Sequence, residues 1–414
     1  MTVTDRVTAA ASGGVPTPTR RAWPLAFTAA ATLPAIGSGQ RELRIDLFRG
    51  LALWLIFIDH VSPDVLSWFT IRSYGFSDAA EIFIFLSGFT AAFVYGRTLF
   101  EGGFVIGGAR ILRRVWQIYC AHILLFFVLI AAVALVTQVT GNGFYMQEME
   151  VTDFFRDPGP AMIQALILRY RPLNMDVLPL YVVLMAALPL ILVLARWRAD
   201  VPLAVSIALY VATNRFDLYL SSYPGGFWSF NPFAWQLLFV FGAWCALGGG
   251  DRMAPLVSRP AVFWIAVGYI FACFLVTLTW YFPQLGQLMP AWLVRLIYPI
   301  DKTDLDILRF GHFLALAVVA LRFVPSGWRG LESAWAQPLI LCGQYSLQIF
   351  SLGVALSFVG YALLTETAAG FLMHVVAGVL GIVIMCGVAL TFTWYKRALS
   401  ATARRHKPPA VHSA

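Results

Sequence analysis

Charged residues are scarce in this chain of 414 residues: they make up 12% of it, whereas hydrophobic residues make up 60%. Soluble domains carry roughly a quarter of charged residues. The scarcity of charge therefore excludes a soluble fold and indicates that lipid solvates much of the surface. The charges that remain sum to +8. On a membrane protein such a basic excess is a sign of topology, so nucleic-acid binding is not expected.

Paired cysteines are absent as well. The five cysteines form no C-x-x-C motif, and all lie inside apolar stretches: Cys120, Cys245, Cys273, Cys342 and Cys386. Neither a structural disulfide nor a metal site is expected from this pattern. We interpret these residues as small members of the apolar core.

Long apolar runs divide the chain into ten candidate membrane spans. A transmembrane helix needs about 20 predominantly apolar residues. The runs are 43–62, 79–99, 115–138, 177–195, 200–214, 233–249, 261–281, 309–324, 336–360 and 370–395. The sequence therefore predicts an all-α integral membrane protein with about ten transmembrane helices.

Two tails flank these spans, and no internal repeat or soluble domain interrupts them. Residues 1–40 are rich in Thr, Ala, Pro, Gly and Ser, which predicts a disordered cytoplasmic tail. Residues 41–396 form the predicted membrane domain. Residues 397–414 are predicted to be a basic cytoplasmic tail.

The placement of arginine predicts the orientation of the spans. If the N-terminus is cytoplasmic, Arg97, Arg110, Arg113 and Arg114 all fall in one inside loop, as the positive-inside rule requires. Outside cations are then diluted by acidic residues, and an even number of spans returns the C-terminus to the cytoplasm.

The long loops fall on the predicted outer side, at 139–176, 215–232 and 282–308. Aromatic residues in these loops fit either an interfacial belt or a surface on which sugars stack. These residues are Phe144, Tyr145, Trp228, Trp292 and Tyr298.

Ionisable residues are concentrated in the first predicted helix, where each is costly and is therefore a functional candidate. Asp46, Arg49 and His60 fall within one narrow stripe at about 100° per residue. Asp46 and Arg49 are three residues apart and can pair, which would also fit a simple interfacial anchor. Asp59 points about 100° away from His60.

A second acidic cluster opens the next predicted helix. Asp78 and Glu81 have the spacing of a capping box. An alternative interpretation is that these carboxylates orient His60 across the bundle.

Further polar residues gather near the predicted outer ends of later helices. Each fits a helix cap or an interhelical hydrogen bond, but together they suggest a polar cavity that opens outward. The candidate substrate-binding residues are Asn174, Asp176, Asn231, Trp235, Gln236, Asp301, Lys302, His312 and Ser346.

On the cytoplasmic side, Arg110, Arg113 and Arg114 follow Gly107 and Gly108. Clustered arginines bind phosphates well, so this segment could hold the nucleotide part of a cofactor. Topology alone explains the same charges.

Several separated blocks resemble the OpgC family. The strongest is the segment from Leu43 to Gly96, with R-I-D-L-F-R-G, I-D-H and G-F-S-D-A-A-E-I-F-I-F-L-S-G. Further blocks lie at 174–181, 231–239, 301–303 and 341–347. The family is part of a wider group that includes the acyltransferase-3 proteins and the lysosomal heparan N-acetyltransferase. The group shows an Arg, ten residues and then a His, a spacing that Arg49 and His60 keep.

The resemblance implies a succinyltransferase in the bacterial inner membrane. It would move a succinyl group from cytoplasmic succinyl-CoA to sugar hydroxyls of osmoregulated periplasmic glucans. His60 has the pKa of a general base near neutral pH, and Asp59, Asp78 or Glu81 would hold its ring. Acylation of His60 itself is an alternative. The succinyl carboxylate needs a cationic partner, for which Arg49 and Lys302 are candidates.

Two other functions compete with this prediction. The first is an acetyltransferase for another envelope glycan, because the motif does not specify the acyl group. The second is a transporter or flippase, since charges inside a helical bundle also serve transport. We find no repeated halves of the kind that many transporters show.

Overall fold

The computed structural model describes residues 42–325 and 327–405. The predicted tail 1–40 and the last part of the predicted basic tail, from 406 to 414, lie outside the described residues. Helices account for most of what is described, and the β-structure found there is one isolated bridge between Ser221 and Phe227.

The longer helices are α1 (Leu43–Val61), α2 (Ala79–Gly102), α3 (Phe104–Thr140), α7 (Val177–Trp197), α8 (Asp200–Phe216), α9 (Pro232–Trp244), α11 (Pro260–Tyr281), α14 (Ile307–Phe323), α16 (Ser346–Glu366) and α17 (Phe371–Arg405). The shorter elements are η1 (Leu66–Phe69), η2 (Ile71–Ser73), α4 (Phe144–Glu148), α5 (Thr152–Arg156), α6 (Pro158–Leu166), η3 (Cys245–Gly249), α10 (Gly250–Val257), α12 (Pro283–Gly286), α13 (Ala291–Ile297), η4 (Arg329–Glu332) and α15 (Ala336–Gln344).

Each predicted span coincides with a helix, and the all-α membrane class is confirmed. Two of the spans are interrupted. The sixth, 233–249, passes from α9 into η3, where Gly248 has φ +100°, and the ninth divides at Tyr345 into α15 and α16.

Seven helices in the described chain are long and apolar enough to cross a membrane. The helices α8 and α14 are not among these seven because they have 17 residues each. Helix α1 is not among them because it carries four charged residues. The number of crossings and the side of each terminus stay predictions.

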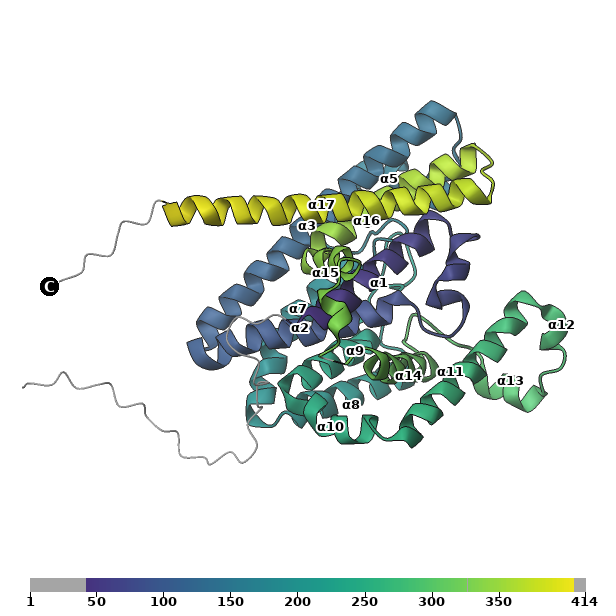
Figure 1. The fold of residues 1–414 in the computed structure, drawn as a ribbon. Coiled ribbons are helices and arrows are strands. Elements are labelled where there is room, and N and C mark those ends of the chain that lie inside the picture. Colours follow the sequence, from purple (N-terminus) through teal and green to yellow (C-terminus); the bar gives the residue numbers. More distant parts are fainter. Residues whose placement is uncertain (1–41, 326, 406–414) are drawn as a thin grey trace, which may run out of the picture.

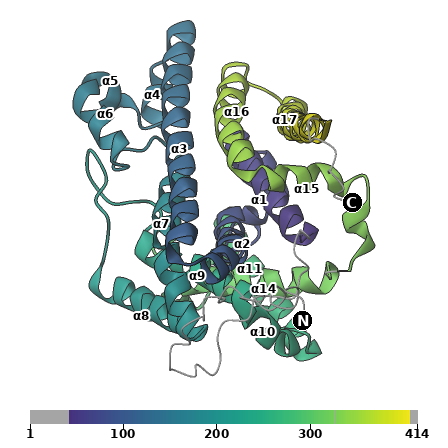
Figure 2. The same ribbon diagram turned by 90° about the vertical axis from the view of Figure 1, so that its left-hand side faces the viewer.

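Helix α1 occupies the centre of the bundle, between α2, α15 and α16 (Figure 2). Two glycines let it touch α15 backbone to backbone. A Cβ on Gly50 would collide with the carbonyl of Leu339, and a Cβ on Gly343 would collide with the carbonyl of Asp46. Small residues allow this close approach in membranes, and here they fix the helix that carries the candidate histidine.

Helices α2 and α9 cross in the same way. Gly88 lies against the backbone of Phe239, and Gly242 lies against the backbone of Phe85. The N-terminal half of α2 is therefore packed closely against α9.

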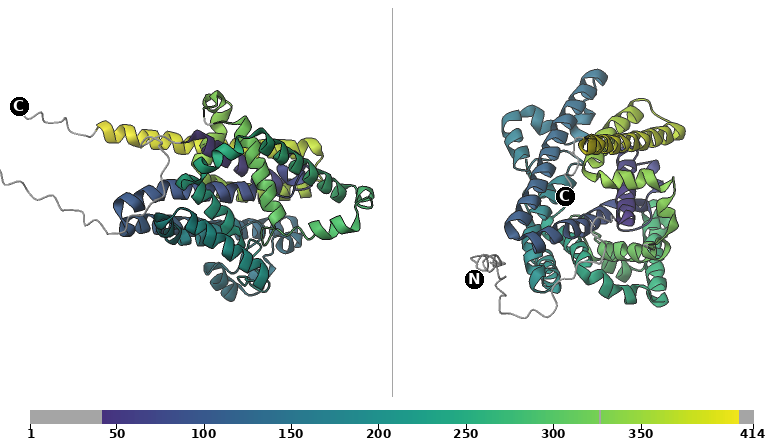
Figure 3. Two further views of the ribbon diagram at one scale, coloured as in Figure 1. Left: turned by 90° about the horizontal axis from the view of Figure 1, so that it is seen from below. Right: turned by 60° about the vertical axis from the view of Figure 1, so that its left-hand side comes forward.

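Helices at the periphery are much less covered by protein. The most apolar stretch of α11 is 17% buried and that of α17 is 22% buried, compared with 61% for α2. The last turns of α17 extend beyond the other helices (Figures 1 and 3). We assign these uncovered faces to lipid.

The two ends of the bundle differ in what they carry. Figure 1 shows the turn between α2 and α3 and the last turns of α17 at the left, whereas α12 and α13 project at the right. The segment 97–114 and the end of α17 thus lie toward the same end, as the predicted alternation of inside and outside loops requires.

Candidate active site

A cavity of about 590 Å³ lies at the end of the bundle where α1 finishes and α2 begins. Its size is within the usual range of small-molecule sites, roughly 300–1,000 Å³. The residues that line it come from seven segments: Asp59, His60, Pro63, Arg72, Gly75, Phe76, Ser77, Asp78, Glu148, Met149, Leu173, Asn174, Trp280, Tyr281, Lys302, Arg309, Val354, Ser357, Phe358 and Tyr361. The predicted polar cavity is therefore present, and His60 lines it.

His60 lies on the last turn of α1 and is half-buried. Its neighbour Asp59 is buried and accepts a hydrogen bond from Thr70 Oγ1 at 2.6 Å. Among the described residues, no hydrogen bond joins the His60 ring to Asp59, Asp78 or Glu81. In this structure the three carboxylates do not hold the ring as expected, because each is engaged by another partner.

Asp78 and Glu81 form the predicted capping box at the start of α2. Ala80 N donates to Asp78 Oδ1 at 2.8 Å, and Asp78 N donates to Glu81 Oε2 at 2.9 Å. Both carboxylates also bind a cation from α14. Arg309 donates to Glu81 Oε1 from Nε at 2.9 Å and from Nη2 at 2.6 Å, and Nη2 lies 3.4 Å from Asp78 Oδ2.

Lys302 completes this charged group, and its Nζ donates to Asp78 Oδ2 at 2.6 Å. The Lys302 side chain remains 43% exposed, compared with 13% for Asp78 and 0% for Glu81. Burial alone would raise the pKa of Asp78, but the charges of Lys302 and Arg309 lower it by more, and the net pKa is well below the ordinary value. Asp78 is therefore a carboxylate at neutral pH and cannot supply a proton.

The loop that carries Lys302 is held by two of the predicted binding residues. Asn231 Nδ2 donates to Asp304 Oδ1 at 2.8 Å, and Trp235 Nε1 donates to the carbonyl of Lys302 at 3.0 Å. Neither side chain lines the cavity. Because Trp235 is fully buried, its effect on a substrate is indirect, through the position of Lys302.

The other predicted residues in these two blocks are also outside the cavity. Asp301 accepts from the backbone N of Thr303 at 2.8 Å, which closes the turn next to Lys302. Gln236 exchanges hydrogen bonds with Ser206 on α8. Their roles in this structure are to hold the loop and to join two helices.

His312 lies behind the cavity wall. It is 2% exposed, and its Nδ1 accepts from the backbone N of Ser77 at 3.2 Å and lies 2.7 Å from Ser77 Oγ. Gly75 packs directly on the ring, with no room for a Cβ. His312 therefore shapes the turn before Asp78 and does not face a substrate.

Asn174 lines the cavity as predicted, with φ +67°, but its neighbour Asp176 does not. Asp176 Oδ1 accepts from Arg171 Nε at 2.8 Å. The guanidinium of Arg171 also covers the ring of Trp228 at 4.4 Å. The pair of Arg171 and Asp176 fixes the segment before α7. Asn174 is the polar residue of that segment that lines the cavity.

Three predicted site residues lie far from the cavity. Asp46 and Arg49 are buried near the beginning of α1, and Arg49 is about 16 Å from His60 along the helix axis because eleven residues separate them. Ser346 begins α16, whereas the cavity is lined by Val354 and later residues of that helix. Of the two candidate partners for a succinyl carboxylate, Lys302 is in the cavity and Arg49 is not.

The predicted nucleotide-binding arginines lie at the other end of α2. Arg110 and Arg113 are exposed on the first turns of α3. Arg110 donates to Thr98 Oγ1 at 3.1 Å, and Arg114 donates to Gln117 Oε1 at 3.3 Å. Thr98 lies 20 residues after Asp78 along α2, so roughly 30 Å separates this cluster from the cavity.

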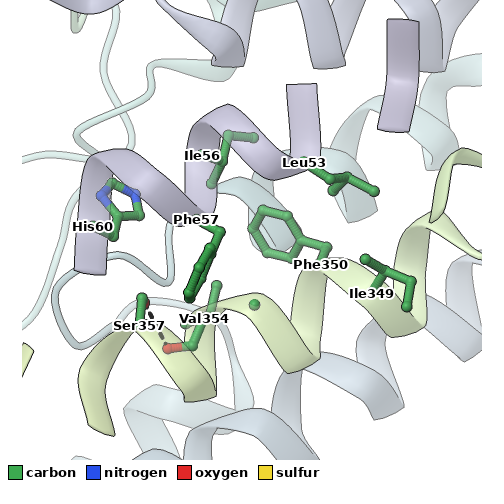
Figure 4. Close-up of a pocket in the computed structure, with 9 residues that line it drawn as sticks. Leu53, Ile56, Phe57, His60, Ile349, Phe350, Val354 and Ser357 are labelled. Carbon is green, nitrogen blue, oxygen red and sulfur yellow. Dashed lines mark hydrogen bonds between the residues drawn. The ribbon is translucent and has the colours of Figure 1, made fainter. Parts of the chain in front are cut away.

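A narrow crevice leads inward from His60 between α1 and α16 (Figure 4). It has a volume of about 10 Å³ and is lined by apolar side chains apart from His60 and Ser357. The Ser357 hydroxyl donates to the carbonyl of Val354 at 2.9 Å. A space of this size holds about one water molecule, so a larger group can pass only if these side chains move.

Residues 41–397 match the family described as OpgC protein. The chain belongs to the OpgC family. Neither the curated proteins nor the solved structures contain a match.

Membership of the OpgC family indicates a glucan-modifying membrane acyltransferase. The resemblance found in separate sequence blocks is thereby confirmed. The structure explains why those blocks are distant in sequence, because segments around 60, 78, 174, 302 and 309 meet at one cavity.

Sequence reasoning missed several residues of the OpgC-family cavity. Arg309 was not selected as a site residue, because it begins the predicted span 309–324 and its partner Glu81 lies 228 positions earlier. Arg72 and Glu148 line the cavity from outer loops, and nothing in their local pattern distinguishes them. Trp280 and Tyr281 were counted as the end of an apolar span.

Proposed function

We propose that this protein moves a succinyl group from cytoplasmic succinyl-CoA to sugar hydroxyls of osmoregulated periplasmic glucans, with His60 as the general base. The proposal rests chiefly on one observation: a single cavity brings His60 together with a cation-rich wall at the predicted outer end of the bundle. Membership of the OpgC family supports acyl transfer to a glucan.

The proposed reaction is a direct transfer. The sugar oxygen attacks the carbonyl carbon of the thioester, and a ring nitrogen of His60 takes the hydroxyl proton. The C–S bond breaks, and the thiolate of coenzyme A leaves and takes up a proton. No covalent intermediate on the protein is needed, since both substrates reach the same side chain from opposite faces.

The charged wall provides a place for the free carboxylate of the succinyl group. Lys302 keeps much of its side chain exposed while it is bound to Asp78. Its ammonium group can therefore bind a second anion. Arg72 also lines the cavity and forms no ion pair with a carboxylate in the described part of the chain. A neutral acetyl group would use neither cation.

The donor must reach the cavity from the cytoplasmic side. The crevice between α1 and α16 points inward from His60 (Figure 4), and the proposal requires it to widen when the donor binds. Arg110, Arg113 and Arg114 would bind the nucleotide phosphates of the donor when it arrives from the cytoplasm, before its thioester moves on to His60.

Reconstituted vesicles test this proposal. Purified protein is placed in liposomes, and succinyl-CoA labelled on the succinyl group and a glucan are supplied on opposite sides of the membrane. We expect label on the glucan as an ester. If the protein transferred an acetyl group from acetyl-CoA but no succinyl group, its donor would be acetyl-CoA. If glucan crossed the membrane without being acylated, the protein would be a transporter and the proposal would be wrong.

A further inference from the structure

Two aromatic side chains stand at the mouth of the cavity, at the end of α11. Trp280 and Tyr281 both line it, with 45% and 37% of their surfaces exposed. The rest of α11 lies at the periphery of the bundle. These two rings are therefore the point at which a lipid-facing helix reaches the candidate active site.

Both rings are held in place by neighbours. Trp280 Nε1 donates to Tyr298 OH at 2.5 Å, and its ring stacks on Phe76 with 6.3 Å between centroids. The ring of Tyr281 lies 4.2 Å from that of Trp68. An aromatic surface fixed in this way binds a ligand at little cost in side-chain entropy.

The rest of the cavity wall combines apolar side chains, such as Leu173 and Phe358, with several polar ones. Glu148 and Asn174 contribute hydrogen-bonding groups from the segment between α3 and α7, and Lys302 contributes a cation. A ligand that suits both walls must have an apolar face and a rim of hydroxyl groups. A pyranose ring meets this description, whereas a lipid chain would leave the polar groups of the cavity without partners.

We propose that Trp280 and Tyr281 form the acceptor subsite, on which a pyranose ring of the glucan stacks while its hydroxyl faces His60. The role of this sugar as the acyl acceptor rests on the proposed function. The sugar-binding subsite itself rests on the aromatic and polar side chains that line the cavity. Trp280 and Tyr281 are therefore residues that bind the acceptor and not the acyl donor.

An interfacial aromatic belt is the competing explanation, and the chain offers matched controls for it. Trp292 on α13 is 63% exposed, and Trp264 at the other end of α11 is 67% exposed. Neither lines the cavity. If exposure to the interface were all that mattered, these tryptophans would respond to substitution as Trp280 does.

The test measures binding of a linear glucose oligosaccharide to the purified protein by calorimetry, without any acyl donor. Trp280→Ala and Tyr281→Ala are each expected to raise the Kd about tenfold, the size of effect typical of a good aromatic contact. Trp292→Ala and Trp264→Ala are expected to leave it unchanged. Trp280→Phe keeps a ring for stacking and should bind nearly as well as the wild type.

Acyl transfer by the same variants separates this inference from the proposed function. We expect Trp280→Ala to raise the KM for the acceptor and to leave the KM for the donor unchanged. If Trp280→Ala binds the oligosaccharide as tightly as Trp292→Ala does, the subsite is wrong even when succinyl transfer is observed. If the wild type binds the oligosaccharide through Trp280 but transfers no acyl group, the subsite stands and the proposed function fails.

Discussion

The two ends of the α1–α2 hairpin carry similar charges but use them differently. At the cavity end, Glu81 is fully buried and binds Arg309 from a helix more than 200 residues later. At the other end, Arg97 pairs with Glu101 one turn away, and both side chains are about half exposed or more. Burial and long-range contacts therefore distinguish the candidate site, while the number of charges does not.

The physical cause of the difference is the cost of burying charge. An ion in an apolar interior is tolerated when it is paired and hydrogen-bonded, so Glu81 requires Arg309. Exposed pairs are screened by solvent and contribute little. Here the buried pair also places Arg309 beside Asp78, the carboxylate that binds Lys302.

The largest effect is expected from breaking that buried pair. Arg309→Met leaves the fully buried Glu81 without its partner, which should cost about 3–5 kcal/mol of stability. Thermal unfolding in detergent and the yield of folded protein report the loss. Arg252→Met is the matched control, because its pair with Asp200 is exposed and should contribute about 1 kcal/mol or less. Equal losses in the two variants would contradict the comparison between the ends.

A smaller effect, confined to activity, is expected at Lys302. Lys302→Met removes the exposed cation but leaves Asp78 near Arg309, so the protein should fold. We expect kcat/KM with succinyl-CoA to fall about 10- to 100-fold, as for loss of a charged hydrogen bond. Lys302→Arg should recover part of the activity. An unchanged kcat/KM would mean that Lys302 only supports Asp78.

Substitution of Arg72 should change the selectivity for the donor, by less than the Lys302→Met substitution changes kcat/KM. Arg72→Gln is expected to lower the preference for succinyl-CoA over acetyl-CoA by about fivefold, because an exposed charge contributes about 1 kcal/mol. Arg295→Gln is the control, since Arg295 is exposed on α13 and does not line the cavity. A competition assay with both donors gives the ratio directly, and the same drop with acetyl-CoA alone would rule out recognition of the succinyl carboxylate.

The smallest effect is expected at the opposite end of the hairpin. Replacing Arg110, Arg113 and Arg114 together with Gln should raise the KM for acyl-CoA by about threefold and leave the acceptor KM unchanged, because Arg110 and Arg113 are exposed to solvent. Initial rates at several donor concentrations measure this. An unchanged donor KM would leave the three arginines as markers of topology.

Local patterns predicted much of this architecture. Apolar runs of about 20 residues locate the helices, and the spacing of Asp78 and Glu81 predicts the capping box, because both signals lie within a few residues of each other. The break at Tyr345 was not predicted, although the polar residues Gln344, Ser346 and Gln348 surround it in the run from 336 to 360. Glycine contacts such as that of Gly343 with Asp46 depend on the partner helix and have no local signal.

The candidate site was predicted less completely than the fold. His60 and Lys302 were predicted because an ionisable group in or next to an apolar span is costly and is therefore a functional candidate. His312, Asn231 and Trp235 were assigned to substrate binding, but they lie behind the wall and position other residues. Side-chain direction depends on the packing of distant helices, which no single stretch of sequence encodes.

The central claim is that His60 performs the proton transfer in the cavity, and one measurement tests it most directly. Turnover is measured with purified His60→Asn protein, saturating succinyl-CoA and glucan, beside His374→Asn as a control. His374 is also a half-buried histidine, bonded to Ser62 Oγ at 2.7 Å, and it does not line the cavity. The account predicts that His60→Asn lowers kcat by about 10²–10⁴-fold, while His374→Asn stays near the wild-type rate. A His60→Asn protein that acylates glucan at nearly the wild-type rate would contradict it.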